Sequence, residues 1–213
     1  MKIKDGSQTI LRLSLAANAI FFVFMALVSI RYQIPQKILG HIAPKQESAS
    51  VDKKRMYSEI TSLFPYYKTT KARIVMLGDS LTYSANWNEM FDDCTIVNRG
   101  ISSDTTEGVL KRLDNVISLN PEKVFVMIGI NDIGLGIPED MTVSNYKKIC
   151  DALISNGIQP IVQSTLFTRS DRRINRKVTS INDAMKEFCD RKNIEYIDIN
   201  SGLSFDGALK KEY

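Results

Sequence analysis

The stretch IVMLGDSLTYS, residues 74–84, decides the fold of this chain. Four apolar residues run directly into Gly78, Asp79 and Ser80, and the apolar run ends there. A continuous apolar run that stops at small and polar residues is typical of a strand buried on both faces of a sheet. The change at Gly78 then marks either an ordinary strand-to-helix turn or a serine hydroxyl held at the end of a sheet for chemistry.

The same pattern repeats along the rest of the chain. Apolar runs rich in β-branched residues predict strands at residues 73–77, 94–98, 123–130, 158–165 and 194–199. Apolar residues at helical spacing predict helices between them, within residues 110–117, 142–156 and 174–188. Strands that alternate with helices indicate a parallel sheet covered on both faces. We therefore predict a three-layer α/β/α sandwich with a five-stranded parallel sheet and flavodoxin-like winding.

Charge is unevenly distributed along the 213 residues. Residues 1–69 hold 10 Lys/Arg and 4 Asp/Glu, whereas residues 70–213 hold 18 and 20. The formal net charge of +4 therefore comes from the N-terminal segment. The predicted domain shows no basic stripe suited to a phosphate backbone, and we do not expect nucleic acid as a partner.

Residues 13–30 contain no charged side chain over 18 positions and are bracketed by Arg12 and Arg31. This is about the minimum length for a membrane-spanning helix, and no small-x-small cleavage site follows it cleanly. We predict a single-pass transmembrane signal anchor here, after a short basic N-terminus at residues 1–12. A cleaved signal peptide and a buried core helix are the alternatives.

The predicted anchor is followed by a linker with a lead-in helix, residues 31–70, and then by the domain, residues 71–213. The positive charges that flank the anchor are nearly balanced, so they do not decide its orientation. Because the basic segment before the anchor resembles an export signal, we expect a domain held at the membrane on the extracytoplasmic side, at the cell surface or in the periplasm. The oligomeric state is left open.

The three cysteines, Cys94, Cys150 and Cys189, lie far apart and show no CxxC or Cys/His spacing. Neither a zinc site nor a disulfide framework is indicated, and we expect buried apolar side chains instead. No metal, nucleotide or other cofactor is expected.

Small and hydrogen-bonding residues follow the first three strands, at the edge where open parallel sheets bind ligands. Ser80 follows the first strand, Gly100 lies in NRGISSDT after the second, and Asn131 lies in GIND after the third. The Ser80 hydroxyl can be exposed at such a turn, and the Gly100 backbone and Asn131 amide can donate to one oxygen. Converging donors are what a tetrahedral acyl-transfer intermediate needs. A helix cap for Ser80 and turn roles for the other two stay open.

GDS after an apolar strand, NRGISSDT one strand later and GIND after the next together resemble the SGNH (GDSL) hydrolase family. The resemblance covers residues 71–213 and includes three of the four marker blocks of the family, in order. It implies that Ser80 is the nucleophile and that Gly100 and Asn131 belong to the oxyanion hole. Ser103 stands where many relatives carry glycine. The implied function is a serine esterase that hydrolyses acetyl or short acyl esters through an acyl-enzyme intermediate, on small molecules or on surface glycans or lipids.

The fourth marker block, a D-x-x-H with the catalytic base, has no counterpart in the chain. A serine hydroxyl is a weak nucleophile until a base takes its proton. The single histidine, His41, precedes the first strand, where we expect a solvated linker residue. We therefore expect a C-terminally incomplete hydrolase domain that is inactive or weakly active.

Two alternatives to a hydrolase stay open. The first is a non-catalytic glycan- or lipid-binding descendant of the family, which the absent histidine motivates. The second is a flavodoxin-like phosphate or cofactor binder, in which a serine after the first strand would hold the ligand. The GIND segment would have no role in that second alternative.

Overall fold

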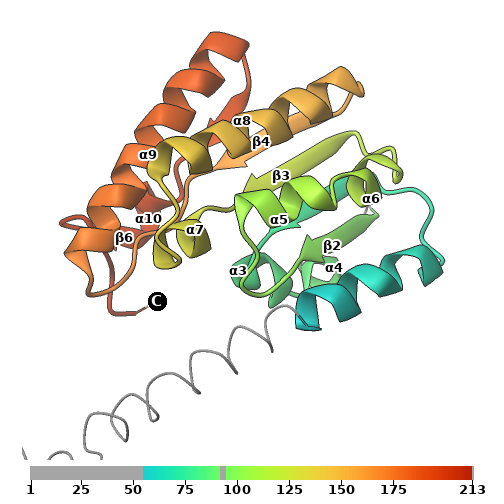
Figure 1. The fold of residues 1–213 in the computed structure, drawn as a ribbon, viewed down its shortest axis with the longest axis horizontal. Helices are drawn as coiled ribbons and strands as arrows, with labels where there is room; N and C mark the ends of the chain where they lie inside the picture. Colours follow the sequence, from blue (N-terminus) through green and yellow to red (C-terminus); the bar gives the residue numbers. More distant parts are fainter. Residues whose placement is uncertain (1–54, 92–94, 213) are drawn as a thin grey trace, which may run out of the picture. The chain divides into compact units, whose positions relative to one another are not determined.

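The computed structural model describes residues 55–91 and 95–212. Five strands form one parallel sheet in the order β2-β1-β3-β4-β5 (Figure 1). Their bounds are β1 Ile74–Gly78, β2 Ile96–Gly100, β3 Lys123–Met127, β4 Gln159–Gln163 and β5 Glu195–Ile197. Each strand overlaps its predicted run, and the order is that of a flavodoxin-like winding. The predicted five-stranded parallel α/β sheet is confirmed.

Helices connect the strands. The three longest with printed bounds are α5 Thr106–Lys111, α8 Glu139–Ser155 and α9 Arg172–Lys192. The short ones are η1 Phe64–Tyr66, α3 Ser80–Tyr83, α4 Trp87–Met90, α6 Asp114–Ile117, α7 Ile130–Gly134 and α10 Asn200–Leu203. Residues 55–63 are also helical, and a hairpin of β6 (Ser204–Phe205) and β7 (Ala208–Leu209) follows α10.

The helix α9 shows how local sequence sets an element. The Asp171 side chain accepts hydrogen bonds from the Arg173 and Ile174 amides and caps the N-terminus. The helix ends at Asn193, whose left-handed backbone is typical of a helix C-terminus. Between these ends, apolar residues at helical spacing are buried. The apolar face and the two caps therefore indicate the same bounds for α9.

The sheet carries helices on both faces. Helix α8 contacts both α5 and α9, and the main hydrophobic core joins these helices to one side of the strands, including Val124 and Val126 of β3 (Figure 1). The opposite face meets α3, which contacts β1 and β2. Phe125 and Met127 share that face with α3, because they are the register partners of Met76 and Gly78, and both are only half-buried. The second helical layer is therefore thin in the described part of the chain.

The helical segment before the first strand packs on the domain. The Tyr57 hydroxyl donates to the Gly108 carbonyl at 2.8 Å. The Arg99 guanidinium of β2 lies 4.5 Å from the Phe64 ring centroid and 5.5 Å from that of Tyr67. The lead-in segment is therefore in contact with the predicted domain, and the domain start at residue 71 stays a prediction.

No helix within residues 55–91 and 95–212 is long and apolar enough to cross a membrane. The predicted anchor at residues 13–30 lies outside these described residues, so it stays a prediction. The same holds for the predicted linker up to residue 54.

We predict that Phe64→Ala destabilises the domain by about 2–4 kcal/mol, because it removes a buried ring and the cation–π contact with Arg99. Tyr66→Ala is the matched control, since Tyr66 is 82% exposed two residues away. Chemical denaturation of both variants measures the difference. Equal stability of the two variants would show that the lead-in segment does not hold the domain together.

Candidate active site

The turn between β1 and α3 presents Ser80 at the carboxyl edge of the sheet. Helix α3 begins at Ser80, and its N-cap is Asp79, whose Oδ1 accepts a hydrogen bond from the Leu81 amide at 3.1 Å. The helix-cap alternative for Ser80 is therefore wrong. Among the described residues, no hydrogen bond engages the Ser80 hydroxyl, which is half-buried. The turn thus leaves a serine hydroxyl available for chemistry.

Two glycines let α3 approach the ends of β1 and β2. Gly78 and Gly100 are register partners. A Cβ atom at Gly100 would lie 2.2 Å from the Tyr83 nitrogen, and one at Gly78 would lie 2.3 Å from the Thr82 Oγ1. Any side chain at either position would push α3, and with it Ser80, away from the sheet. Both glycines thus have a packing reason that is independent of a ligand.

The Gly100 amide is already paired in the structure. It donates to the Asn98 Oδ1 at 2.8 Å, and the Asn98 Nδ2 in turn donates to the Thr82 and Tyr83 carbonyls at 3.0 and 3.1 Å. Asn98 therefore fastens α3 to β2, a role that sequence reasoning missed. The oxyanion role of Gly100 stays a prediction, and it would require the Gly100 amide to exchange partners.

Asn131 lies beside the Ser80 turn. It stands in α7, directly after β3, and its Nδ2 donates to the Asp104 carbonyl at 2.9 Å and lies 3.5 Å from the Asp79 Oδ2. The structure thus brings Asn131 next to the residue that precedes Ser80. The neighbouring Asp132 is fully buried and accepts a hydrogen bond from the Thr106 amide at the start of α5, so it has a structural role.

The loop between β2 and α5 contains a strained residue. Ser103 has a φ of 64°, in the left-handed region that favours glycine, and the following Asp104 amide donates to the Ile101 carbonyl at 3.1 Å. No hydrogen bond among the described residues uses the Ser103 amide.

Three buried carboxylates surround this edge of the sheet. Burial, together with the charges of Asp104 and Asp132, raises the pKa of Asp79 to about 6. Burial also raises the pKa of Asp104, although the Arg112 guanidinium opposes that rise, and it raises the pKa of Asp132. The local field is therefore negative, which favours a cationic base and opposes a developing anion.

Residues 55–91 and 95–212 include no histidine, and His41 lies outside them, as does Cys94. Cys150 and Cys189 are free and buried. Within the same ranges, no group of three His, Cys, Asp or Glu side chains could hold a metal ion.

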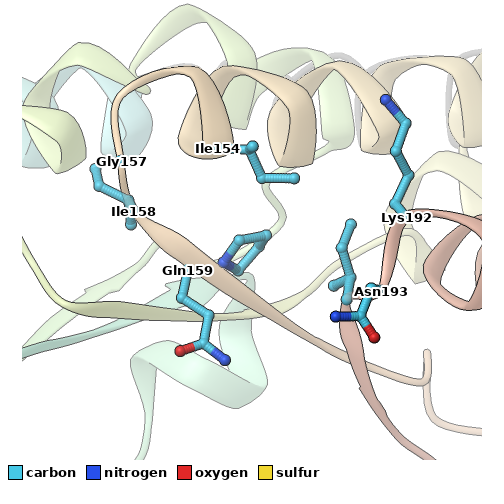
Figure 2. Close-up of a pocket in the computed structure, with 8 residues that line it drawn as sticks. Ile154, Gly157, Ile158, Gln159, Lys192 and Asn193 are labelled. Carbon is cyan, nitrogen blue, oxygen red and sulfur yellow. The ribbon is translucent and has the colours of Figure 1, made fainter.

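An open pocket of about 310 Å³ lies at the other end of the sheet (Figure 2). It is lined by the C-terminal ends of α8 and α9 and the start of β4, and includes Ile154, Gln159 and Lys192. In a parallel sheet the amino ends of the strands lie opposite the carboxyl ends. The pocket is therefore separate from the edge that carries Ser80.

The carboxyl edge of the sheet thus carries the Ser80 hydroxyl at the start of α3 and the Asn131 amide near Asp79. Residues 76–213 match the model of the GDSL-like lipase/acylhydrolase family, so the chain belongs to this family. This confirms the SGNH (GDSL) assignment, and hydrolysis is the function at the level of the family.

Similar proteins include the N-acylneuraminate cytidylyltransferase of Streptococcus agalactiae serotype V, which is 28% identical over 177 residues. The match covers 81% of this chain but only 40% of that protein. A solved structure from Streptococcus pneumoniae, described as a candidate platelet activating factor, has a TM-score of 0.69 at 24% identity and covers 81% of this chain and 86% of its own. A GDSL-like lipase of Bacteroides thetaiotaomicron has a TM-score of 0.66 at 21% identity, covering 74% and 85%. Both structures share the fold.

We predict that Ser103→Gly raises the free energy of unfolding by up to about 1 kcal/mol, because glycine adopts the left-handed backbone without a Cβ penalty. Ser102→Gly is the matched control. Ser102 has no positive φ, so glycine there only adds entropy to the unfolded chain and should destabilise. Urea titration of both variants gives the comparison, and destabilisation by both would contradict the assigned conformation of Ser103.

The raised pKa of Asp79 predicts a pH-dependent stability. The folded state holds the proton up to about pH 6, whereas the unfolded chain releases it near 3.8, so stability is lost as pH rises between these values. Asp79→Asn keeps the cap acceptor and removes this loss. Relative to wild type, it should gain up to about 3 kcal/mol between pH 4 and pH 7.

The control for this pH effect is Asp171→Asn, at the exposed cap of α9. The pKa of Asp171 is lowered by hydrogen bonds from the Ile174 and Arg173 amides, so its carboxylate stabilises the fold at higher pH. Asp171→Asn should therefore differ from wild type by a constant amount between pH 4 and pH 7, because the Asp171 carboxylate is already ionised in both the folded and the unfolded chain over that range. Thermal unfolding across this pH range tests both variants, and parallel curves for wild type and Asp79→Asn would refute the assigned burial of the Asp79 charge.

Proposed function

We propose that the protein is a serine esterase that hydrolyses acetyl or other short acyl esters, with Ser80 as the nucleophile. The observation that carries the proposal is the Ser80 turn. Asp79 caps α3, and the Asn98 side chain holds α3 at the strand ends through a hydrogen bond. The absence of Cβ atoms at Gly78 and Gly100 allows this close approach. The serine hydroxyl is held in place but is not used by the fold.

The reaction would proceed in two steps. The Ser80 oxygen attacks the ester carbonyl and gives its proton to a base, and the tetrahedral intermediate then expels the alcohol to leave an acyl-enzyme. Water, activated by the same base, releases the acid and restores the serine. The developing oxyanion would be met by the Asn131 Nδ2, which the structure holds beside Asp79. Each well-placed donor of this kind is worth about 3–4 kcal/mol of transition-state stabilisation.

A second donor is needed from the β2–α5 loop. Gly100 would serve if its amide left the Asn98 Oδ1, and the Ser103 amide is an alternative that requires no bond to break. The left-handed backbone at Ser103 supports this alternative, since a strained residue in a loop beside a nucleophile is a candidate for function. We keep Ser80 and Asn131 as the proposed catalytic pair and place the second donor in this loop.

The base is the component that the described residues do not supply. The alternative of a non-catalytic glycan- or lipid-binding protein rests on this point. An added base distinguishes the esterase from the binding protein, because imidazole can accept the proton of a serine that has no base of its own. A pure binding protein needs no ordered nucleophile, so imidazole should have no Ser80-dependent effect on it.

We predict that imidazole raises p-nitrophenyl acetate hydrolysis by the 213-residue chain and that Ser80→Ala removes the increase. The increase should follow the neutral form of imidazole and grow as pH rises through about 6.5–7. Imidazole alone also hydrolyses this ester, so Ser80→Ala supplies the background rate. His41→Ala is the second control and should leave the rate unchanged. Equal rates for wild type and Ser80→Ala at every imidazole concentration would remove the esterase proposal and favour binding.

The physiological substrate and location are further proposals. A domain anchored outside the cytoplasm through residues 13–30 would meet O-acylated surface glycans or lipids. The cytidylyltransferase activity in the name of the Streptococcus agalactiae relatives is not part of the proposal. The match covers 40% of those proteins, and it overlaps the residues that match an acylhydrolase model.

A further inference from the structure

Arg112 is a charged side chain buried beneath the candidate site. It follows α5 directly, and its side chain is 1% exposed. Its Nε donates to the Asp104 Oδ2 at 2.8 Å, and Asp104 is 2% exposed at the side chain. Its Nη2 donates to the Gly78 carbonyl at 3.2 Å. One guanidinium therefore holds the end of β1 and the loop that follows β2.

These two contacts extend to the end of the third strand. The carbonyl of Asp104 accepts the Asn131 Nδ2 hydrogen bond at 2.9 Å, so the residue that pairs with Arg112 also orients the Asn131 amide. The Gly78 carbonyl also accepts the Ile101 amide at 3.1 Å, and Gly78 stands two residues before Ser80. Arg112 thus links the segments that carry Ser80, Ser103 and Asn131.

The energetics argue for a geometric role. The desolvation free energy of a buried ion pair is commonly larger than the Coulomb attraction between its two charges. Well-packed apolar residues therefore often replace such pairs without loss of stability. The Arg112 Nη1 is also buried without a hydrogen-bond partner, which adds a further cost. What an apolar side chain at this position cannot provide is two directed donors, one for each loop.

We propose that Arg112 is a positioning residue for the esterase reaction, acting through Asp104 on the Asn131 amide and through Gly78 on the Ser80 turn. This inference rests on the proposed function. It assigns Arg112 no contact with substrate. Its role is to keep the nucleophile and the oxyanion donor at one fixed separation.

The kinetic test compares Arg112→Met with Lys111→Met. Methionine approximates the length of the arginine stem without its donors, whereas Lys111 is an exposed neighbour that pairs with Glu107. With imidazole as the base, Arg112→Met should lower the Ser80-dependent kcat about 10- to 100-fold with KM within about twofold, after correction for the folded fraction. Lys111→Met should behave as wild type. A kcat that follows the folded fraction alone would overturn the proposal.

Arg112→Lys is a second variant for the case that Arg112→Met does not fold. Its single ammonium can reach Asp104 or the Gly78 carbonyl, but it lacks the planar fork that holds both. It should fold and give a kcat between those of wild type and Arg112→Met. A wild-type kcat in a folded Arg112→Lys would show that charge alone suffices and would refute positioning by the fork.

An NMR measurement separates this inference from the proposed function. The Asn131 side-chain amide is assigned by its loss in Asn131→Asp, and its hydrogen exchange is followed together with that of the Ile101 amide. Both should exchange at least about tenfold faster in Arg112→Lys than in wild type, while amides of α9 stay unchanged. If wild type shows no Ser80-dependent hydrolysis, the esterase proposal is refuted, whereas the exchange measurement still tests whether Arg112 positions the two loops. Unchanged exchange of both groups would refute positioning by Arg112, whatever the activity.

Discussion

The close approach of α3 to the ends of β1 and β2 is the constraint on which the site depends. It is possible because Gly78 and Gly100 are paired in register and neither carries a Cβ atom, which would fall 2.2–2.3 Å from α3. The Asn98 amide then fastens the carbonyls of α3 to β2. Once α3 is fixed in this way, the backbone leaves Ser80 at the sheet edge with its hydroxyl uncommitted. Packing therefore places Ser80, and the proposed chemistry would use a geometry that the fold already requires.

The fold was accessible from the sequence because its signals are local. Each strand is a short apolar run and each long helix shows helical spacing, so both the parallel sheet and its winding followed from the pattern. The position of the lead-in segment was not accessible. Arg99 packs against Phe64 and Tyr67 across about 30 residues of sequence, and an arginine normally predicts a solvated side chain. Only the tertiary structure shows that this arginine is buried against two rings.

The site was only partly predictable, for a related reason. Residue types at strand ends identified Ser80, Gly100 and Asn131, and the structure places Asn131 at the Ser80 turn. Hydrogen-bond partners depend on atomic geometry, however, and sequence could not show that the Gly100 amide is paired with Asn98. Nor could it show that Asp79 caps α3. Arg112 carried no signal at all, since a basic residue at the end of a helix ordinarily interacts with the helix dipole and solvent.

The electrostatics of the site follow from these buried groups. An oxyanion that forms near Asp79, Asp104 and Asp132 would be destabilised by their negative charges. Each of these charges is compensated in a different way. Arg112 neutralises Asp104, hydrogen bonds from Thr106 stabilise Asp132, and the raised pKa of Asp79 lets it take up a proton near pH 6. Lower pH therefore relieves the repulsion on the oxyanion, whereas a neutral imidazole base requires higher pH. In the proposed reaction these two requirements oppose each other, so the negative field would limit the rate at high pH and protonation of the imidazole would limit it at low pH. A cationic imidazolium formed during the attack would in turn be stabilised by the same carboxylates.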